Sequence, residues 1–254
     1  MAVTTISYFR FDGWSGRIWA FVQMGLARRK LSATPRIEFW KLFGTGSGHG
    51  FTLWPNTGLW AILATWPDLE TARAQVNKSL VFRSFRRKSD EDYTVFLDPV
   101  SCRGEWDDQL PFAVEVQPDA LPKPLAVLTR ATVKPHRALK FWKRAPAVSD
   151  TIGENDDVVF KAGMGELPGV QQVTFSIWPD MATMSRFAYR SPAHTKAIRA
   201  VREGAVFKEE LYARFAVLGT EGSWLGGDPV AAHLVKAAAQ NAADSPETVR
   251  AEGA

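Results

Sequence analysis

The chain has 254 residues, and its 46% hydrophobic content is enough to bury one large core or two smaller ones. A formal net charge of +4 is too small to indicate a nucleic-acid partner. The single cysteine, Cys102, excludes an intrachain disulfide and is typical of a reducing compartment. The N-terminus lacks a signal-peptide profile, and no apolar run reaches the ~20 residues of a membrane span. We therefore expect a soluble cytoplasmic protein or one that is peripheral to a membrane.

The pattern of apolar residues predicts strand, helix, strand, strand, helix and strand in each half of the chain. The helix at 17–30 has Ile18, Phe21 and Val22 at helical spacing, and Asp68 is a suitable N-cap for the next helix. The predicted elements are 5–10, 17–30, 38–43, 59–66, 68–76 and 93–98, followed by 125–133, 137–148, 158–164, 172–178, the segment after 180, and 211–218.

The two halves also repeat each other in sequence. Arg10, Arg17, Phe21 and Lys41 recur as Arg130, Arg137, Phe141 and Lys161; Trp66-Pro67-Asp68 and Ser79 recur as Trp178-Pro179-Asp180 and Ser191; Tyr93 and Phe96 recur as Tyr212 and Phe215. The offset between copies changes only where loops are expected. A duplicated fold is the simplest interpretation.

This element order is that of a ferredoxin-like βαββαβ unit. We therefore predict an α+β protein made of two tandem ferredoxin-like repeats, packed sheet to sheet as a single-chain dimeric α+β barrel that encloses an apolar space. The predicted domains are a first repeat at 1–103, a Pro- and charge-rich connector at 104–123, a second repeat at 124–227, and a tail at 228–254 with a short helix.

Of the four histidines, His194 carries the most information. Ser191 and Pro192 form a helix-start signal, so His194 falls in the first turn of a predicted helix. It shares a face there with Ile198 and Val201, and Phe187 lies one element earlier. Its counterpart in the first repeat is Phe82. Two interpretations stay open, a core histidine bonded to a backbone carbonyl and an axial haem ligand in an apolar, aromatic pocket.

Basic residues give a second set of candidates. Lys161, or its counterpart Lys41, is a candidate partner for a haem propionate, with Arg190 or Arg199 near His194 as the other. Both lysines are equally compatible with an outward position at a sheet edge. The basic run from Arg83 to Lys88 is either a solvated helix face or a contact with anionic lipid.

Several long segments are similar to the spheroidene monooxygenases of carotenoid synthesis in purple bacteria. They include YFRFDG at 8–13, FWKLFG at 39–44, WAILATWPD at 60–68, LTRAT at 128–132, QVTFSIWPD at 172–180, His194 with AIRAVR at 197–202, and EELYARFAVL at 209–218. The resemblance covers roughly residues 5–225.

This resemblance implies an enzyme that holds haem b, uses dioxygen and takes electrons from ferredoxin. The implied reaction inserts oxygen twice at the terminal allylic carbon of an acyclic carotenoid, so that spheroidene becomes its 2-keto product. The resemblance favours His194 as the axial ligand, in the aromatic space between the sheets. From the spacing described above, we expect Phe187, Ile198 and Val201 beside the cofactor and Lys161 and Arg190 as partners of its propionates. It leaves open a peripheral position at the inner or photosynthetic membrane.

Two other classes of function stay open at this point. Another haem enzyme of the same barrel type, such as an aldoxime dehydratase or a haem-degrading enzyme, would use the same histidine. A haem-free protein that binds an apolar ligand would use the aromatic residues alone. An absorption spectrum and the products of turnover distinguish the three.

Overall fold

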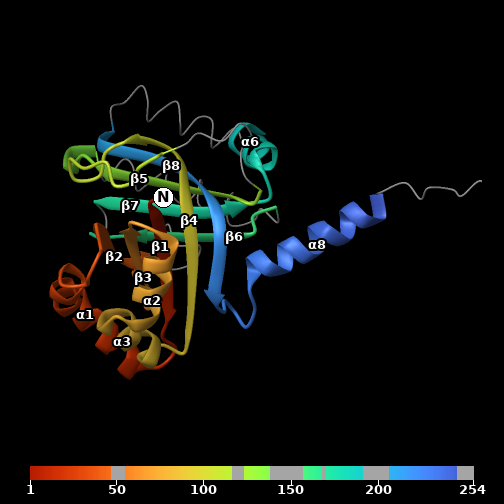
Figure 1. Cartoon of the computed structure of the whole chain (residues 1–254). Coiled ribbons are helices and arrows are strands. Elements are labelled where there is room, and N and C mark those ends of the chain that lie inside the picture. Colours follow the sequence, from red (N-terminus) through yellow and green to blue (C-terminus); the bar gives the residue numbers. More distant parts are fainter. Residues whose placement is uncertain (47–54, 116–122, 138–156, 168–169, 191–205, 245–254) are drawn as a thin grey trace, which may run out of the picture.

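The computed structural model describes residues 1–46, 55–115, 123–137, 157–167, 170–190 and 206–244. Eight strands form one closed antiparallel barrel in the order β1-β3-β2-β6-β7-β5-β8-β4 (Figure 1). The strands are β1 (Val3–Arg10), β2 (Phe39–Gly46), β3 (Pro55–Trp66), β4 (Glu91–Gly104), β5 (Leu125–Val133), β6 (Phe160–Gly165), β7 (Gln171–Trp178) and β8 (Phe207–Gly222). The predicted α+β class and closed barrel are confirmed.

The helices of the described part lie outside the barrel. They are α1 (Trp14–Ser32), α2 (Leu69–Lys78), α3 (Leu80–Lys88), α6 (Met181–Arg190) and α8 (Pro229–Asp244). Figure 1 shows α1, α2 and α3 together on one side of the barrel, and α8 projecting away from it. At 16 residues, α8 is longer than the short helix that we expected there. None of the described helices combines the length and apolar character that crossing a bilayer requires.

Both halves of the barrel have the same relative strand order, β4-β1-β3-β2 and β8-β5-β7-β6. The halves join through the pairs β2–β6 and β4–β8, so their strands form one continuous sheet instead of two stacked ones. The helix predicted at 137–148 lies largely outside the described residues. The tandem repeat and the domain boundaries therefore stay predictions.

The repeated Trp-Pro-Asp segment has the same local structure in both halves. Asp68 caps α2, where its carboxylate accepts a 2.7 Å hydrogen bond from the Thr71 N–H. Asp180 does the same for α6 with the Thr183 N–H at 2.8 Å. In both cases the carboxylate satisfies a backbone donor that has no partner within its own helix. Each hydrogen bond also lowers the pKa of its aspartate below the ordinary value.

The pairing of Lys41 with Lys161 is wrong. Lys41 lies opposite Leu63, whose side chain is part of the barrel interior. Lys161 lies opposite Ser176, between two interior residues of β6, and therefore points outward. Successive side chains of a strand point to opposite faces, so an offset that is wrong by one residue exchanges the inside for the outside.

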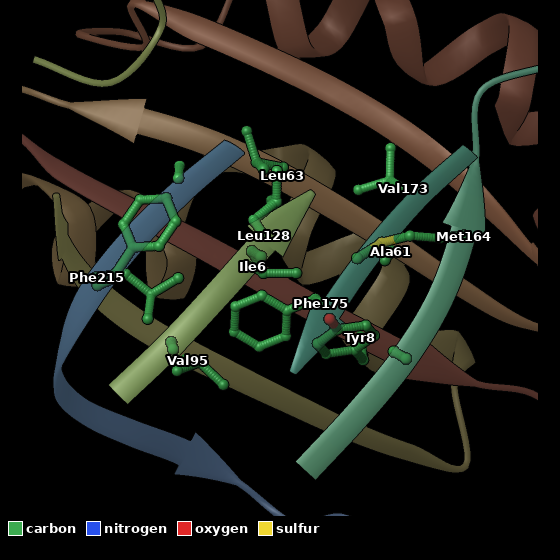
Figure 2. Close-up of a cluster of buried hydrophobic side chains, with 14 of the residues drawn as sticks. Ile6, Tyr8, Ala61, Leu63, Val95, Leu128, Met164, Val173, Phe175 and Phe215 are labelled. Atoms are coloured by element: carbon green, nitrogen blue, oxygen red, sulfur yellow. The ribbon is translucent and has the colours of Figure 1, made fainter. Parts of the chain in front are cut away.

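Two separate apolar clusters stabilise the fold. The interior cluster fills the barrel with side chains from all eight strands, and Figure 2 shows part of it, including Tyr8, Phe175 and Phe215. The outer cluster lies between the β1–β4 sheet and the helices α1, α2 and α3. Strand β3 contributes to both clusters, which explains why its sequence is almost wholly apolar.

Helix α1 presents the opposite face from the one its sequence suggests. The apolar residues at helical spacing, Ile18, Phe21 and Val22, are 62%, 65% and 48% exposed. The buried residues of this helix are Ala20, Gln23, Ala27 and Leu31. Small side chains allow the helix to approach the sheet closely, and the larger ones are left on the outside.

Candidate functional site

The barrel interior is filled by the protein's own aromatic side chains. The ring of Tyr8 lies 5.1 Å from that of Phe160, 6.4 Å from Phe175 and 5.7 Å from Trp224, centroid to centroid. Tyr8 has no accessible surface, Phe175 and Phe160 are buried, and Trp224 is partly exposed. A cofactor-sized space would leave the side chains that line it accessible. The expectation of an enclosed apolar site between the sheets is therefore wrong for the described residues.

A tryptophan-containing turn closes each end of the barrel. Trp106 follows β4 and pairs with Gln109, and Trp224 follows β8 and pairs with Gly227. Trp106 is fully buried, and Trp224 packs against the interior cluster. These turns were not predicted, and the first lies in the segment that we assigned to the connector.

The glycine two residues before each tryptophan was a signal for these turns. Gly104 and Gly222 have φ of +95° and +89°. A Cβ on Gly104 would overlap the carbonyl oxygen of Glu210, and one on Gly222 would overlap that of Asp92. Glycine is required at both positions because the turn needs this conformation and this close approach.

Charged residues hold the Trp106 turn in place. The Nζ of Lys41 forms ion pairs with Asp107 and, at 3.2 Å, with Glu166. Glu166 also accepts a 2.9 Å hydrogen bond from the Trp106 indole N–H. The guanidinium of Arg130 is fully buried and lies 5.4 Å from the centre of the Trp106 ring.

The same guanidinium joins the turn to the second half of the barrel. Arg130 bonds Asp107 at 3.1 Å and also pairs with Glu209, which accepts a 3.2 Å hydrogen bond from the Asp108 N–H. A buried cation costs much less when carboxylates surround it, so removal of Asp107 or Glu209 would leave the Arg130 charge poorly compensated. The network includes Asp107, which lies in the segment that we assigned to the connector.

At the other end, Glu91 holds the Trp224 turn. It accepts hydrogen bonds from Ser223 Oγ at 2.9 Å and from the Gly226 N–H at 2.8 Å, and it forms a 3.1 Å ion pair with Arg10. Burial acts to raise the pKa of Glu91, but these hydrogen bonds outweigh it and lower the pKa below the ordinary value.

The outer face of the β5–β8 sheet, called here the second outer face, is the remaining candidate site. Its side chains alternate with interior ones along each strand. They include Val127 and Thr129 of β5, Lys161 of β6, Thr174, Ser176 and Trp178 of β7, and Tyr212 and Arg214 of β8. Of these, all but Trp178 are at least partly exposed, whereas Leu125, which lies opposite Trp178, is fully buried.

Polar groups and rings lie at defined positions on this face. The register places Lys161 and Arg214 at opposite ends of one row across four strands, about 14 Å apart by strand spacing. The hydroxyls of Thr129 and Thr174 are hydrogen-bonded at 2.5 Å in the centre. The ring of Trp178 lies 5.2 Å from that of Phe187 on α6.

The structure therefore brings two of the residues predicted for the site, Lys161 and Phe187, to the second outer face. Arg190 is the last residue of α6, and its side chain is not among the described ones. His194, Ile198 and Val201 lie outside the described residues. Within the described ranges, no three His, Cys, Asp or Glu side chains group to hold a metal ion.

The matching face of the first half is closed. There, Phe82 of α3 is fully buried, and its ring lies 6.2 Å from that of Trp66. Trp66 is the residue that matches Trp178 in the sequence repeat. Trp60 and Ile62 of the same strand are covered as well. The two outer faces therefore differ, because buried apolar side chains fill the first, whereas the second also carries partly exposed polar ones.

Comparison with solved structures identifies the barrel type. An aldoxime dehydratase in complex with butyraldoxime has a TM-score of 0.62 and 10% identity, over 91% of this chain and 85% of that one. A second aldoxime dehydratase has a TM-score of 0.59 and 12% identity, over 85% of this chain and 81% of that one. At these identities the likeness shows the fold alone.

Comparison with curated sequences identifies the family. No family model matches the chain. It is 51% identical over 231 residues to the spheroidene monooxygenase of Cereibacter sphaeroides. The matched region covers 91% of this chain and 71% of that protein. It is 46% identical over 237 residues to that of Rhodobacter capsulatus, covering 93% of this chain and 98% of that protein. With about half of its residues shared along nearly its whole length, this chain belongs to the spheroidene monooxygenase family.

Proposed function

We propose that this protein is a haem-dependent monooxygenase that oxidises the end of an acyclic carotenoid, with dioxygen and with electrons from ferredoxin. The observation that carries this proposal is its identity to two spheroidene monooxygenases over more than 90% of the chain. Their shared name gives spheroidene as the substrate class. The aldoxime dehydratases share only the fold, so they do not favour their own reaction here.

The proposed reaction has two equivalent steps at one allylic carbon. Each step converts a C–H bond into a C–OH bond and reduces the second oxygen atom to water, using two electrons from ferredoxin and two protons. The resulting gem-diol loses water and becomes a ketone. A carbonyl next to the polyene extends its conjugation, so the product absorbs at longer wavelength than spheroidene.

We place the haem against the second outer face. The face fits the group, because the rings of Trp178 and Phe187 offer apolar contact, and Lys161 and Arg214 offer cations for two propionates. The side chains of Thr129 and Thr174 are short, so they project little from the sheet at the centre of this face. Bound haem would supply an iron atom able to activate dioxygen.

We further propose that His194 is the axial ligand. If the second half is a ferredoxin-like repeat of the first, His194 corresponds to Phe82, which packs on the outer face against Trp66. The equivalent contact would direct the imidazole toward Trp178 and the second outer face. A neutral imidazole is needed for ligation, and an apolar surrounding keeps it neutral because burial disfavours the charged form.

The absorption spectrum of the purified protein tests the cofactor and its ligand. Wild-type protein is expected to show an intense Soret band, and His194→Ala is expected to lose or shift it while the far-UV circular dichroism stays unchanged. His136→Ala is the matched control, because His136 is an exposed histidine of the described part. A Soret band that responds to His136→Ala and not to His194→Ala would contradict the assignment.

A second substitution tests the location. Thr174→Trp fills the centre of the second outer face without entering the barrel, and it is expected to lower the haem content of the folded protein. Ser15→Trp, at an exposed position of α1, is expected to leave the haem content unchanged. Full haem loading of Thr174→Trp would place the cofactor elsewhere.

Turnover tests the substrate. Cells that contain spheroidene, ferredoxin and the haem-loaded protein are expected to accumulate a red-shifted keto-carotenoid under oxygen. Unchanged spheroidene, together with turnover of an aldoxime or of free haem, would assign another reaction to the same fold. A protein that binds spheroidene but shows no Soret band would be a haem-free carrier.

A further inference from the structure

Helix α1 carries an apolar stripe on its solvent side. The side chains at spacings of three and four residues are exposed by 76%, 62%, 65%, 48% and 59% for Trp14, Ile18, Phe21, Val22 and Leu26. Residues at these spacings lie on one face of a helix, so they form a continuous stripe. Single exposed apolar residues are ordinary, but a contiguous stripe with two large rings indicates contact with another surface.

The charged residues of the two helices at this surface have one sign. The nineteen residues of α1 include four basic residues and no acidic one, namely Arg17, Arg28, Arg29 and Lys30. The adjacent helix α3 adds four more and no acidic one, namely Arg83, Arg86, Arg87 and Lys88, of which Arg86 forms a 2.9 Å ion pair with Asp92. The rings of Trp19 and Phe85 join the two helices at 5.1 Å. The helices together carry +8 in a chain of net charge +4, so the rest of the chain is net negative.

We propose that α1, supported by α3, docks the protein on the surface of an anionic lipid bilayer. Trp, Phe and Leu on one side of a helix, with Arg and Lys at its borders, is the pattern of a helix that lies in the plane of a membrane interface. The stripe would enter the boundary between headgroups and acyl chains. The exposed cations, Arg28, Arg29, Lys30, Arg83, Arg87 and Lys88, would contact lipid phosphates, and each is expected to strengthen binding about five-fold.

The same charges disfavour the other occupants of this surface. A symmetric dimer through α1 would bring the basic helices of two copies together, and like charges across an interface oppose association. An acidic protein surface would pair with the cations, but it would offer no apolar contact to the five exposed apolar side chains. The proposal does not depend on the proposed reaction, because α1 packs over β2 and β3 and the second outer face belongs to β5–β8.

Flotation with lipid vesicles tests the proposal. The full chain is expected to float with vesicles of phosphatidylcholine mixed with phosphatidylglycerol, and to float much less with pure phosphatidylcholine. The double variant Ile18→Glu and Leu26→Glu is expected to lose binding by at least about 100-fold, because it removes apolar surface and adds two negative charges.

A matched variant separates apolar from electrostatic contact. Ser15→Glu and Ser32→Glu add the same charges to exposed polar positions of the same helix and should weaken binding by only about 25-fold. Equal losses in the two double variants would show that cations alone bind the lipid and would overturn the proposal. So would a wild-type protein that dimerises without lipid and becomes monomeric in the Ile18→Glu and Leu26→Glu variant.

Discussion

Replacing Trp106 by alanine should destabilise the whole barrel, because this side chain closes one end of it. Trp106 is fully buried, and its ring lies 5.7 Å from Phe39 and 6.0 Å from Phe43. Removing a buried tryptophan costs about 3–5 kcal/mol in transfer and cavity free energy. The lost hydrogen bond to Glu166 and the lost contact with the Arg130 guanidinium add about 1 kcal/mol. The expected loss is therefore about 4–6 kcal/mol, comparable to the total stability of a small domain.

Urea unfolding followed by far-UV circular dichroism measures this loss, since ten tryptophans make fluorescence ambiguous. Trp106→Phe keeps most of the ring and removes the N–H, so it should cost about 1–2 kcal/mol. Trp14→Ala is the control, because Trp14 is 76% exposed and its removal should change stability by less than about 0.5 kcal/mol. If Trp106→Ala costs no more than Trp14→Ala, the turn is not a structural closure and the reasoning fails.

Three further predictions follow from the same geometry, and each is read as a change in the urea midpoint. Asp180→Ala removes the cap on the Thr183 N–H and should cost about 1 kcal/mol. Gly104→Ala should cost at least about 2 kcal/mol because of its positive φ and the overlap, whereas Gly25→Ala, in an open helical position, should gain about 0.5–1 kcal/mol. The lowered pKa of Glu91 means that its contribution is complete above the ordinary pKa of about 4.3 and disappears as the pH falls through the lower, folded-state pKa. Glu91→Gln should therefore flatten the stability profile in that acidic range, and an unchanged acid limb would contradict the assignment.

The strands were predictable because their alternation is strong, and β3 because it is apolar on both faces. The face of α1 was not, since helical spacing says which residues share a side but not which side meets the sheet. Its close approach through Ala20 and Ala27 depends on tertiary packing. The same holds for Lys41 and Lys161, where a single residue decides between inside and outside.

The candidate site was predictable only in part. Lys161 and Phe187 lie on one face as the sequence suggested, but that face is outside the barrel. Periodicity shows that an aromatic residue is buried, and it does not show whether the space around it is open or filled. The repeated spacing of Gly104 to Trp106 and Gly222 to Trp224 was visible in the sequence and would have predicted the closed ends.

The closure of the barrel by reciprocal turns has a consequence for the newly made chain. The Trp106 turn relies on Arg130 and Glu209 of the second half, and the Trp224 turn relies on Glu91 of the first. A ribosome that has finished β4 must therefore synthesise more than one hundred further residues, roughly ten seconds of translation, before β8 can pair with it. During that interval the inner face of the first sheet has no partner, so the nascent chain is most exposed to aggregation and to chaperones midway through its synthesis.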